Sequence, residues 1–166
     1  MKIMRRMLCL IMAVVMLSTA AFAANACTTV AVGKDASDTG AVLVAHTCDG
    51  WYDHRIQIVE GGKHAAGEEV EIYGDPCTLT KSDVTLTGTI TQVEETYTMF
   101  NIGYPFMNEK GVVISEFTWS GDYNNFYNGT GMFYIANLEY LGLQRAATAK
   151  ECVEVMGALA EEYGYI

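Results

Sequence analysis

The first 26 residues place the strongest constraint on what this chain can become. Three basic residues occur among the first six, and residues 7–23 form an apolar run without a charge. Small residues at 21–23 (Ala-Phe-Ala) and at 24–26 (Ala-Asn-Ala) each fit a small-x-small cleavage site. This is the pattern of a secretory signal peptide, and the run is shorter than the about 20 residues of a membrane-spanning helix. We therefore expect residues 1–26 to be removed and the mature protein to be exported, to the extracellular space or the cell envelope.

The remainder, residues 27–166, has the length of one domain, since 166 − 26 = 140. The signal segment holds three of the ten Lys and Arg residues and none of the twenty Asp and Glu residues, so the mature net charge is 7 − 20 = −13. A chain this acidic is a poor partner for nucleic acid or for an anionic membrane surface.

Strand patterns fill the first part of the mature chain and helix patterns the last third. Strands are expected at 27–33, 41–46, 55–60, 69–73, 85–90, 94–100 and 112–119, and helices at 132–144 and from the capping box at 148–151 to about Gly164. The nearly all-apolar run 41–46 predicts a strand covered on both faces. Strands followed by helices indicate an α+β fold.

Cys27 directly follows the second cleavage site. Removal of residues 1–26 makes it residue one, so its own α-amine lies within reach of its own thiol. An α-amino group has a pKa of about 7.7 to 8.0 and a thiol of about 8.5, so near neutral pH the amine can accept the thiol proton without large tuning. The position predicts an N-terminal nucleophile: the thiolate attacks an amide carbonyl, and water then hydrolyses the thioester.

An acidic residue follows the second expected strand. Asp49 can orient the α-amine of Cys27 and set its pKa, or it can simply form a turn before Gly50. The other mature cysteines, Cys48, Cys77 and Cys152, are too far apart for a CxxC motif, and we expect them to be buried or paired.

A metal site built from four residues is an alternative interpretation. His46, Cys48, His54 and His64 would supply its ligands, but their spacing matches neither HExxH nor paired CxxC. We therefore expect no metal and no other cofactor.

The mature chain resembles the secreted C69 dipeptidases and, more distantly, penicillin V acylases and bile salt hydrolases. The resemblance is carried by segments 27–49, 51–55, 108–116 and 143–165. The resemblance implies an Ntn-hydrolase αββα sandwich, a free N-terminal cysteine and metal-free hydrolysis of dipeptides or similar small amides. Members of the family run to several hundred residues. We therefore expect residues 27–166 to be the N-terminal part of a truncated, incomplete sandwich, with a small peptide as substrate and homo-oligomers as a property of full-length members.

The resemblance also assigns roles. Cys27 corresponds to the nucleophile and Asp49 to the carboxylate that hydrogen-bonds it. His46 stands where the acylases have an arginine, and it is either a weaker, titrating positive group or a packed strand-end histidine. Glu116 and Thr118, on the last expected strand, are candidates for contact with the substrate amine.

Three other functions compete with the dipeptidase. Acyl-amide hydrolysis of the penicillin V or bile acid type would need an apolar lining, whereas an acidic residue such as Glu116 favours a substrate with a free amine. A lipoprotein acylated at Cys27 fits the small residue before the cysteine but fits Ala24 and Asn25 poorly. The aromatic residues in 119–127 are compatible with a non-catalytic binding module.

Overall fold

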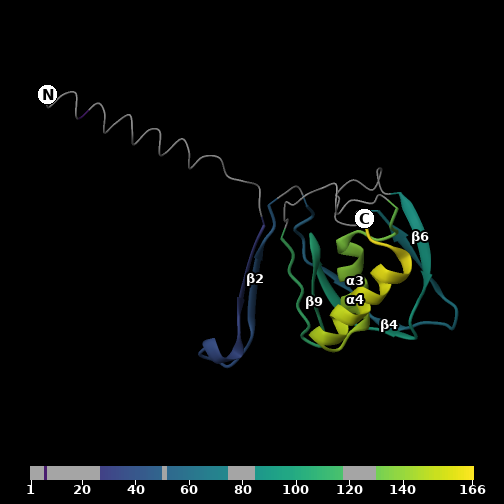
Figure 1. The fold of residues 1–166 in the computed structure, drawn as a ribbon. Helices are drawn as coiled ribbons and strands as arrows, with labels where there is room; N and C mark the ends of the chain where they lie inside the picture. The colour runs from purple at the N-terminus through teal and green to yellow at the C-terminus, as the bar shows by residue number, and fades with distance from the viewer. Residues whose placement is uncertain (1–5, 7–26, 50–51, 75–84, 118–129) are drawn as a thin grey trace.

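The computed structural model describes residue 6 and residues 27–49, 52–74, 85–117 and 130–166. Over these residues the fold is a mixed α/β arrangement of antiparallel sheets and two long helices (Figure 1). The strands are β1 Thr28–Val32, β2 Leu43–Thr47, β3 Gln57–Val59, β4 Gly62–Lys63, β5 Glu69–Tyr73, β6 Leu86–Thr91, β7 Glu95–Thr96, β8 Met99–Ile102 and β9 Tyr104–Asn108. The helices are α3 Ile135–Arg145 and α4 Ala149–Tyr163, with a short 3-10 helix, η1, at Lys34–Ala36.

β1 and β2 form the expected hairpin, which stands beside the rest of the molecule in Figure 1. The two strands are antiparallel, and their pairing runs from Thr28 opposite Thr47 to Val32 opposite Leu43. The expectation that β2 is covered on both faces is wrong, because its residues alternate between exposed and half-buried. Leu43 is 52% exposed, so only one face of this apolar strand is packed.

The remaining strands pair as β3-β8-β9, β4-β7 and β5-β6. The single strand expected at 94–100 is split into β7 and β8, because the amide of Tyr97 leaves the strand pattern and donates to the Gln144 carbonyl of α3 at 2.8 Å. β9 was not expected at all. It follows β8 through Gly103, whose φ of +74° is the left-handed conformation that glycine tolerates.

The strand expected at 112–119 is wrong for its described part, residues 112–117. Only an isolated bridge between Met107 and Val113 is present there. The buried side chain of Asn108 holds the turn that precedes this segment: its Oδ1 accepts from the amide of Val112 at 3.0 Å, and its Nδ2 donates to the carbonyls of Leu143 and Ala146, each at 2.8 Å. One amide thus holds the turn against the C-terminal end of α3, where helix carbonyls lack partners.

α3 packs against α4 on one side and against β9 and β7 on the other (Figure 1). The capping box at the start of α4 is confirmed, since Glu151 N donates to Thr148 Oγ1 at 3.2 Å and Thr148 N donates to Glu151 Oε2 at 3.1 Å. None of the helices in the described part of the chain is long and apolar enough to span a membrane.

α3 lies at the centre of the core and contributes to both hydrophobic clusters. The first cluster comprises Ile72, Ile90, Phe133, Leu138, Leu141 and Leu159. The second comprises Met99, Val112, Leu143, Ala146 and Cys152. Val112 of the second cluster and the hydrogen bonds of Asn108 together fix the chain that leads from β9 toward the hairpin.

Candidate active site

One face of the β1-β2 hairpin gathers the chemistry-bearing residues. Thr29 pairs with His46, and opposed residues of an antiparallel pair share a face. Because strand residues alternate with a period of two, Cys27 and Cys48 belong to the same face. Burial agrees: these four residues are half-buried, whereas Thr28 and Thr47 are exposed.

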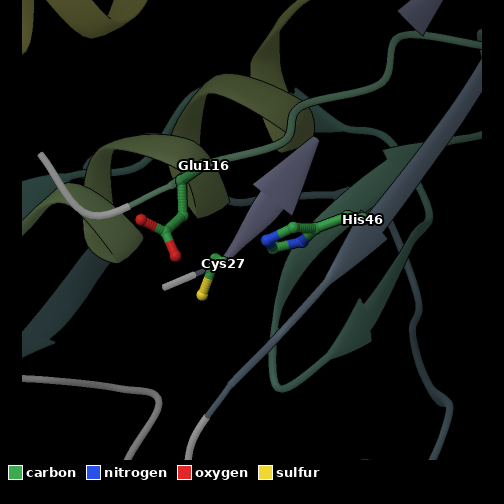
Figure 2. A group of neighbouring side chains, drawn as sticks. All are labelled: Cys27, His46 and Glu116. Carbon is green, nitrogen blue, oxygen red and sulfur yellow. The ribbon is translucent and has the colours of Figure 1, made fainter. Parts of the chain in front are cut away.

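The segment after β9 lies on this face. Thr29 Oγ1 and Ser115 Oγ are 2.6 Å apart in a hydrogen bond that joins the hairpin to this segment. The next residue, Glu116, is thereby brought to the start of β1. The ligand atoms of Cys27, His46 and Glu116 all lie within 4.8 Å of one another (Figure 2).

Figure 2 shows the Cys27 sulfur between the other two side chains, with the His46 ring on one side and the Glu116 carboxylate on the other. The Nε2 atom of His46 is buried and has no hydrogen-bond partner. An unpaired buried ring nitrogen is costly, because it gives up water without replacing it. The Nε2 atom of His46 is therefore a polar atom beside the Cys27 thiol whose hydrogen-bonding capacity the fold does not use.

Two further groups adjoin the cluster. Burial raises the pKa of Cys48 to about 11, with a smaller contribution from the nearby thiol of Cys27. Cys48 therefore stays protonated at neutral pH. Glu139 of α3 is 2% exposed, and its Oε2 has no hydrogen-bond partner. Burial, with a smaller effect of the Glu116 charge, raises the pKa of Glu139 to about 8.

Sequence reasoning missed Glu139. The signal was present, because an acidic residue next to Leu138 in the apolar stripe of a helix is unusual and calls for a reason. What the sequence did not show was that this position faces Glu116, which is 23 residues earlier in the chain.

The other candidate residues fall in different places. Asp49 is exposed just beyond the end of β2, where its charge contributes to the raised pKa of Cys48. Thr118 and Cys77 lie outside the described residues. Cys152 is buried as expected and Cys48 is a half-buried free thiol rather than a buried or paired one.

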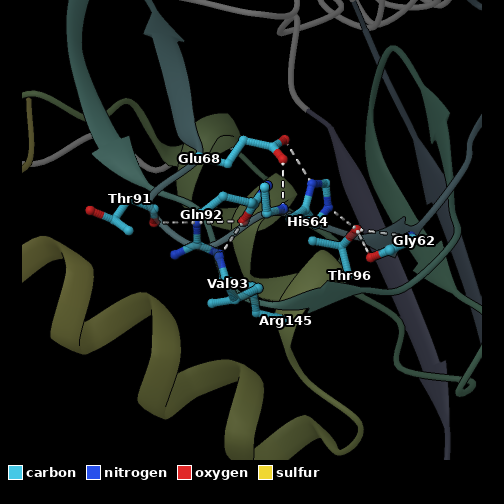
Figure 3. Close-up of polar contacts among 9 residues, drawn as sticks. Gly62, His64, Glu68, Thr91, Gln92, Val93, Thr96 and Arg145 are labelled. Carbon is cyan, nitrogen blue, oxygen red and sulfur yellow. Dashed lines mark hydrogen bonds and ion pairs between the residues drawn. The ribbon is translucent and has the colours of Figure 1, made fainter.

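The alternative metal site from the sequence does not assemble. His54 is exposed, and His64 is bonded elsewhere, with Nδ1 2.8 Å from Glu68 Oε1 and Nε2 2.9 Å from Thr96 Oγ1 (Figure 3). His64 is therefore a structural residue that ties the turn after β4 to β7. Among the described residues, the group of metal-binding side chains that does come together is Cys27, His46 and Glu116.

A groove near the turn end of the hairpin lies away from these groups. It is lined by Val42, Leu43, Val44, Phe106, Met107, Lys110, Gly111, Val112, Val113, Ala147, Thr148 and Ala149. None of Cys27, His46 and Glu116 lines this groove.

A half-buried thiol flanked by an imidazole and a carboxylate, on a mixed α/β scaffold, has the composition of a cysteine hydrolase site. Comparison with known families agrees: the family model described as peptidase family C69 matches residues 26–166. The chain therefore belongs to peptidase family C69 and is a peptide-bond hydrolase, as the resemblance predicted. No curated protein and no solved structure matched the chain.

Proposed function

We propose that this protein is an exported cysteine dipeptidase of the Ntn-hydrolase type, with Cys27 as its N-terminal nucleophile. The observation that carries the proposal is the grouping of Cys27, His46 and Glu116 within 4.8 Å, at the residue that cleavage after Ala26 would expose. The family match covers residues 26–166 and so includes the proposed nucleophile. The proposed scaffold is the αββα sandwich, to which the hairpin and the α3-α4 pair would contribute.

Catalysis begins with transfer of the thiol proton to the α-amine of Cys27, which is free once the signal peptide is removed. The thiolate attacks the scissile carbonyl of the dipeptide, the amine product leaves with a proton, and a thioester remains. Water then hydrolyses the thioester and regenerates the thiol. No cofactor enters these steps.

The neighbouring residues have distinct roles in this proposal. The Nε2 atom of His46 lies beside the sulfur, and when it carries a proton it donates to the thiolate of Cys27. Asp49 orients the α-amine. Glu116 and Thr118 receive the free amine of the substrate, and the position of the Glu116 carboxylate beside the sulfur supports a substrate with a positive end.

The maturation step is tested by intact mass and N-terminal sequencing of the exported protein. We expect a chain that starts at Cys27 with an unmodified amine. A chain that retains residues before Cys27, or a diacylglycerol adduct on its sulfur, would rule out the N-terminal nucleophile and support the lipoprotein alternative.

The reaction is tested by dipeptide hydrolysis with purified mature protein. Cys27→Ser should lose at least about a thousandfold in kcat, because a hydroxyl without a strong base is a poor nucleophile. Thr39→Ala, at the far end of the same hairpin, is the matched control and should retain activity. If the protein hydrolyses penicillin V or conjugated bile acids and does not hydrolyse dipeptides, it is an acylase of the alternative type and not a dipeptidase.

A further inference from the structure

The three side chains around Cys27 also have the composition of a transition-metal site. Their ligand atoms are a thiol sulfur, an imidazole nitrogen and a carboxylate oxygen, contributed by the N-terminal end of β1, by β2 and by the segment after β9. Zn²⁺ takes this mixture of ligands, and many of its open sites use three protein ligands and a water.

We propose that Zn²⁺ binds reversibly to Cys27, His46 and Glu116 and thereby blocks the peptidase. Binding at these three side chains stands on the geometry alone, whereas the block of catalysis rests on the proposed function. The ion is an inhibitor and not a cofactor, because it occupies the sulfur lone pair that the nucleophile would use.

The geometry needs little adjustment to hold the ion. Zinc lies about 2.3 Å from sulfur and about 2.0 to 2.2 Å from nitrogen or oxygen, so tetrahedral ligand atoms are about 3.5 Å apart. The observed upper limit of 4.8 Å requires shifts of roughly 1 Å, which half-buried side chains can make by rotation.

A second observation points independently to an occupant at this place. Nε2 of His46 is buried without a hydrogen-bond partner, whereas both ring nitrogens of His64 are bonded. An imidazole nitrogen that no protein group engages can serve as a metal ligand. The net charge of −10 for the full chain further favours a cation over an anion.

Zinc binding at these side chains involves no oxidation or reduction. The Cys27 thiol releases its proton to solvent as the zinc–sulfur bond forms, and His46 and Glu116 supply lone pairs. Zinc affinity therefore falls as the pH falls, because protons compete for the same ligands.

Cobalt(II) provides the binding test, because it takes zinc sites and its bond to a thiolate absorbs in the near ultraviolet. One equivalent of Co²⁺ added to the purified protein should produce this absorption, and one equivalent of Zn²⁺ should abolish it. Cys27→Ser should remove the band, and His46→Ala and Glu116→Gln should each weaken binding by more than about tenfold. His54→Ala, which changes an exposed histidine outside the cluster, should bind as the unmodified protein does.

The inhibition test uses the same proteins with a dipeptide substrate. Added Zn²⁺ should stop hydrolysis at the stoichiometry measured with Co²⁺, and a chelator should restore it. A cobalt band that survives Cys27→Ser, or no band at one equivalent, overturns the metal site. A protein that binds Co²⁺ through Cys27 yet hydrolyses no amide would contradict the proposed function and leave the metal site intact.

Discussion

At the scale of single residues, two carboxyl groups near Cys27 differ in their surroundings. Glu116 is half-buried beside the sulfur, and Glu139 is buried in α3, near enough to Glu116 to feel its charge. The usual pKa of a glutamate, 4.5, is raised to about 8 at Glu139 by burial and, to a smaller extent, by Glu116. The pair thus divides into one carboxylate that can contact a ligand and one carboxyl that is neutral at pH 7.

Glu139→Gln tests this assignment through stability. Between pH 4.5 and about 8 the folded state holds a proton that the unfolded state has released, so the stability contribution present at low pH is lost as the pH rises through this window. The glutamine side chain of the variant does not titrate, so this loss of unfolding free energy with rising pH is absent. We expect the variant to show a flatter dependence of unfolding free energy on pH, and to be more stable than the unmodified protein at pH 8 by a few kcal/mol.

Urea unfolding at pH 4.5, 6 and 8 measures the effect. Glu116 and Cys152 also titrate near Glu139. The unmodified protein and Glu139→Gln are therefore compared at the same three pH values, so that the contribution of these two groups is common to both. An unchanged slope in Glu139→Gln would show that this carboxyl ionises normally in the folded protein.

Glu116→Gln tests the substrate contact. Loss of a charge-assisted hydrogen bond to the substrate amine, worth about 1.5 to 3 kcal/mol, should raise KM for dipeptides about tenfold or more. Hydrolysis of the same peptides with an acetylated amine should change little. An equal loss for free and acetylated peptides would place Glu116 in the catalytic step instead.

At the scale of elements, the contact between α3 and α4 depends on a glycine. A Cβ at Gly142 would lie 2.8 Å from Cys152 Sγ and 2.9 Å from Met156 Cγ, closer than packed atoms allow. The two helices can approach this closely because Gly142 has no side chain. Gly157, on the exposed side of α4, meets nothing within 4 Å.

These two glycines predict opposite effects of the same substitution. Gly157→Ala should stabilise the protein by about 0.5 to 1 kcal/mol, because alanine is the better helix former. Gly142→Ala gains the same propensity but forces Cys152 and Met156 aside, so a net destabilisation of about 1 to 3 kcal/mol is expected. Thermal or urea unfolding of the two variants measures both, and equal shifts would mean that the helices are farther apart than described.

At the scale of the whole molecule, stability is concentrated around α3 and is weak at the hairpin. The two hydrophobic clusters both include α3 residues, whereas the hairpin presents Val30, Val42 and Leu43 to solvent. The functional cluster therefore sits where the hairpin meets the body, fastened by the Thr29–Ser115 hydrogen bond.

A matched pair of leucines tests this distribution. Leu143 is fully buried in the second cluster and Leu43 is 52% exposed on the hairpin. Leu143→Ala should cost about 2 to 5 kcal/mol in unfolding free energy, and Leu43→Ala should cost at most about 0.5 kcal/mol. Comparable losses would show that the exposed face of the hairpin is covered in solution.

Much of the local structure could be predicted from the sequence, because it depends on neighbours along the chain. Alternation and turn chemistry identified the β1-β2 hairpin and β5, and the Thr148–Glu151 capping box located the start of α4. The position of Cys27 after a cleavage motif and its surrounding segments indicated the peptidase family, which the family match confirms.

Only the tertiary structure decided the features that depend on distant partners. An apolar run such as 41–46 has the same sequence whether one face or both faces are packed. Residues 112–117 pair with β9 through the isolated Met107–Val113 bridge, after a turn that the Asn108 side chain ties to the end of α3. Likewise, the sequence indicated Cys27, His46 and Glu116 as separate candidates. Their ligand atoms lie within 4.8 Å of one another because of the hairpin register and the hydrogen bond between Thr29 and Ser115. Local propensity acts over a few residues, whereas burial and charge at a site are set by side chains that folding brings from far along the chain.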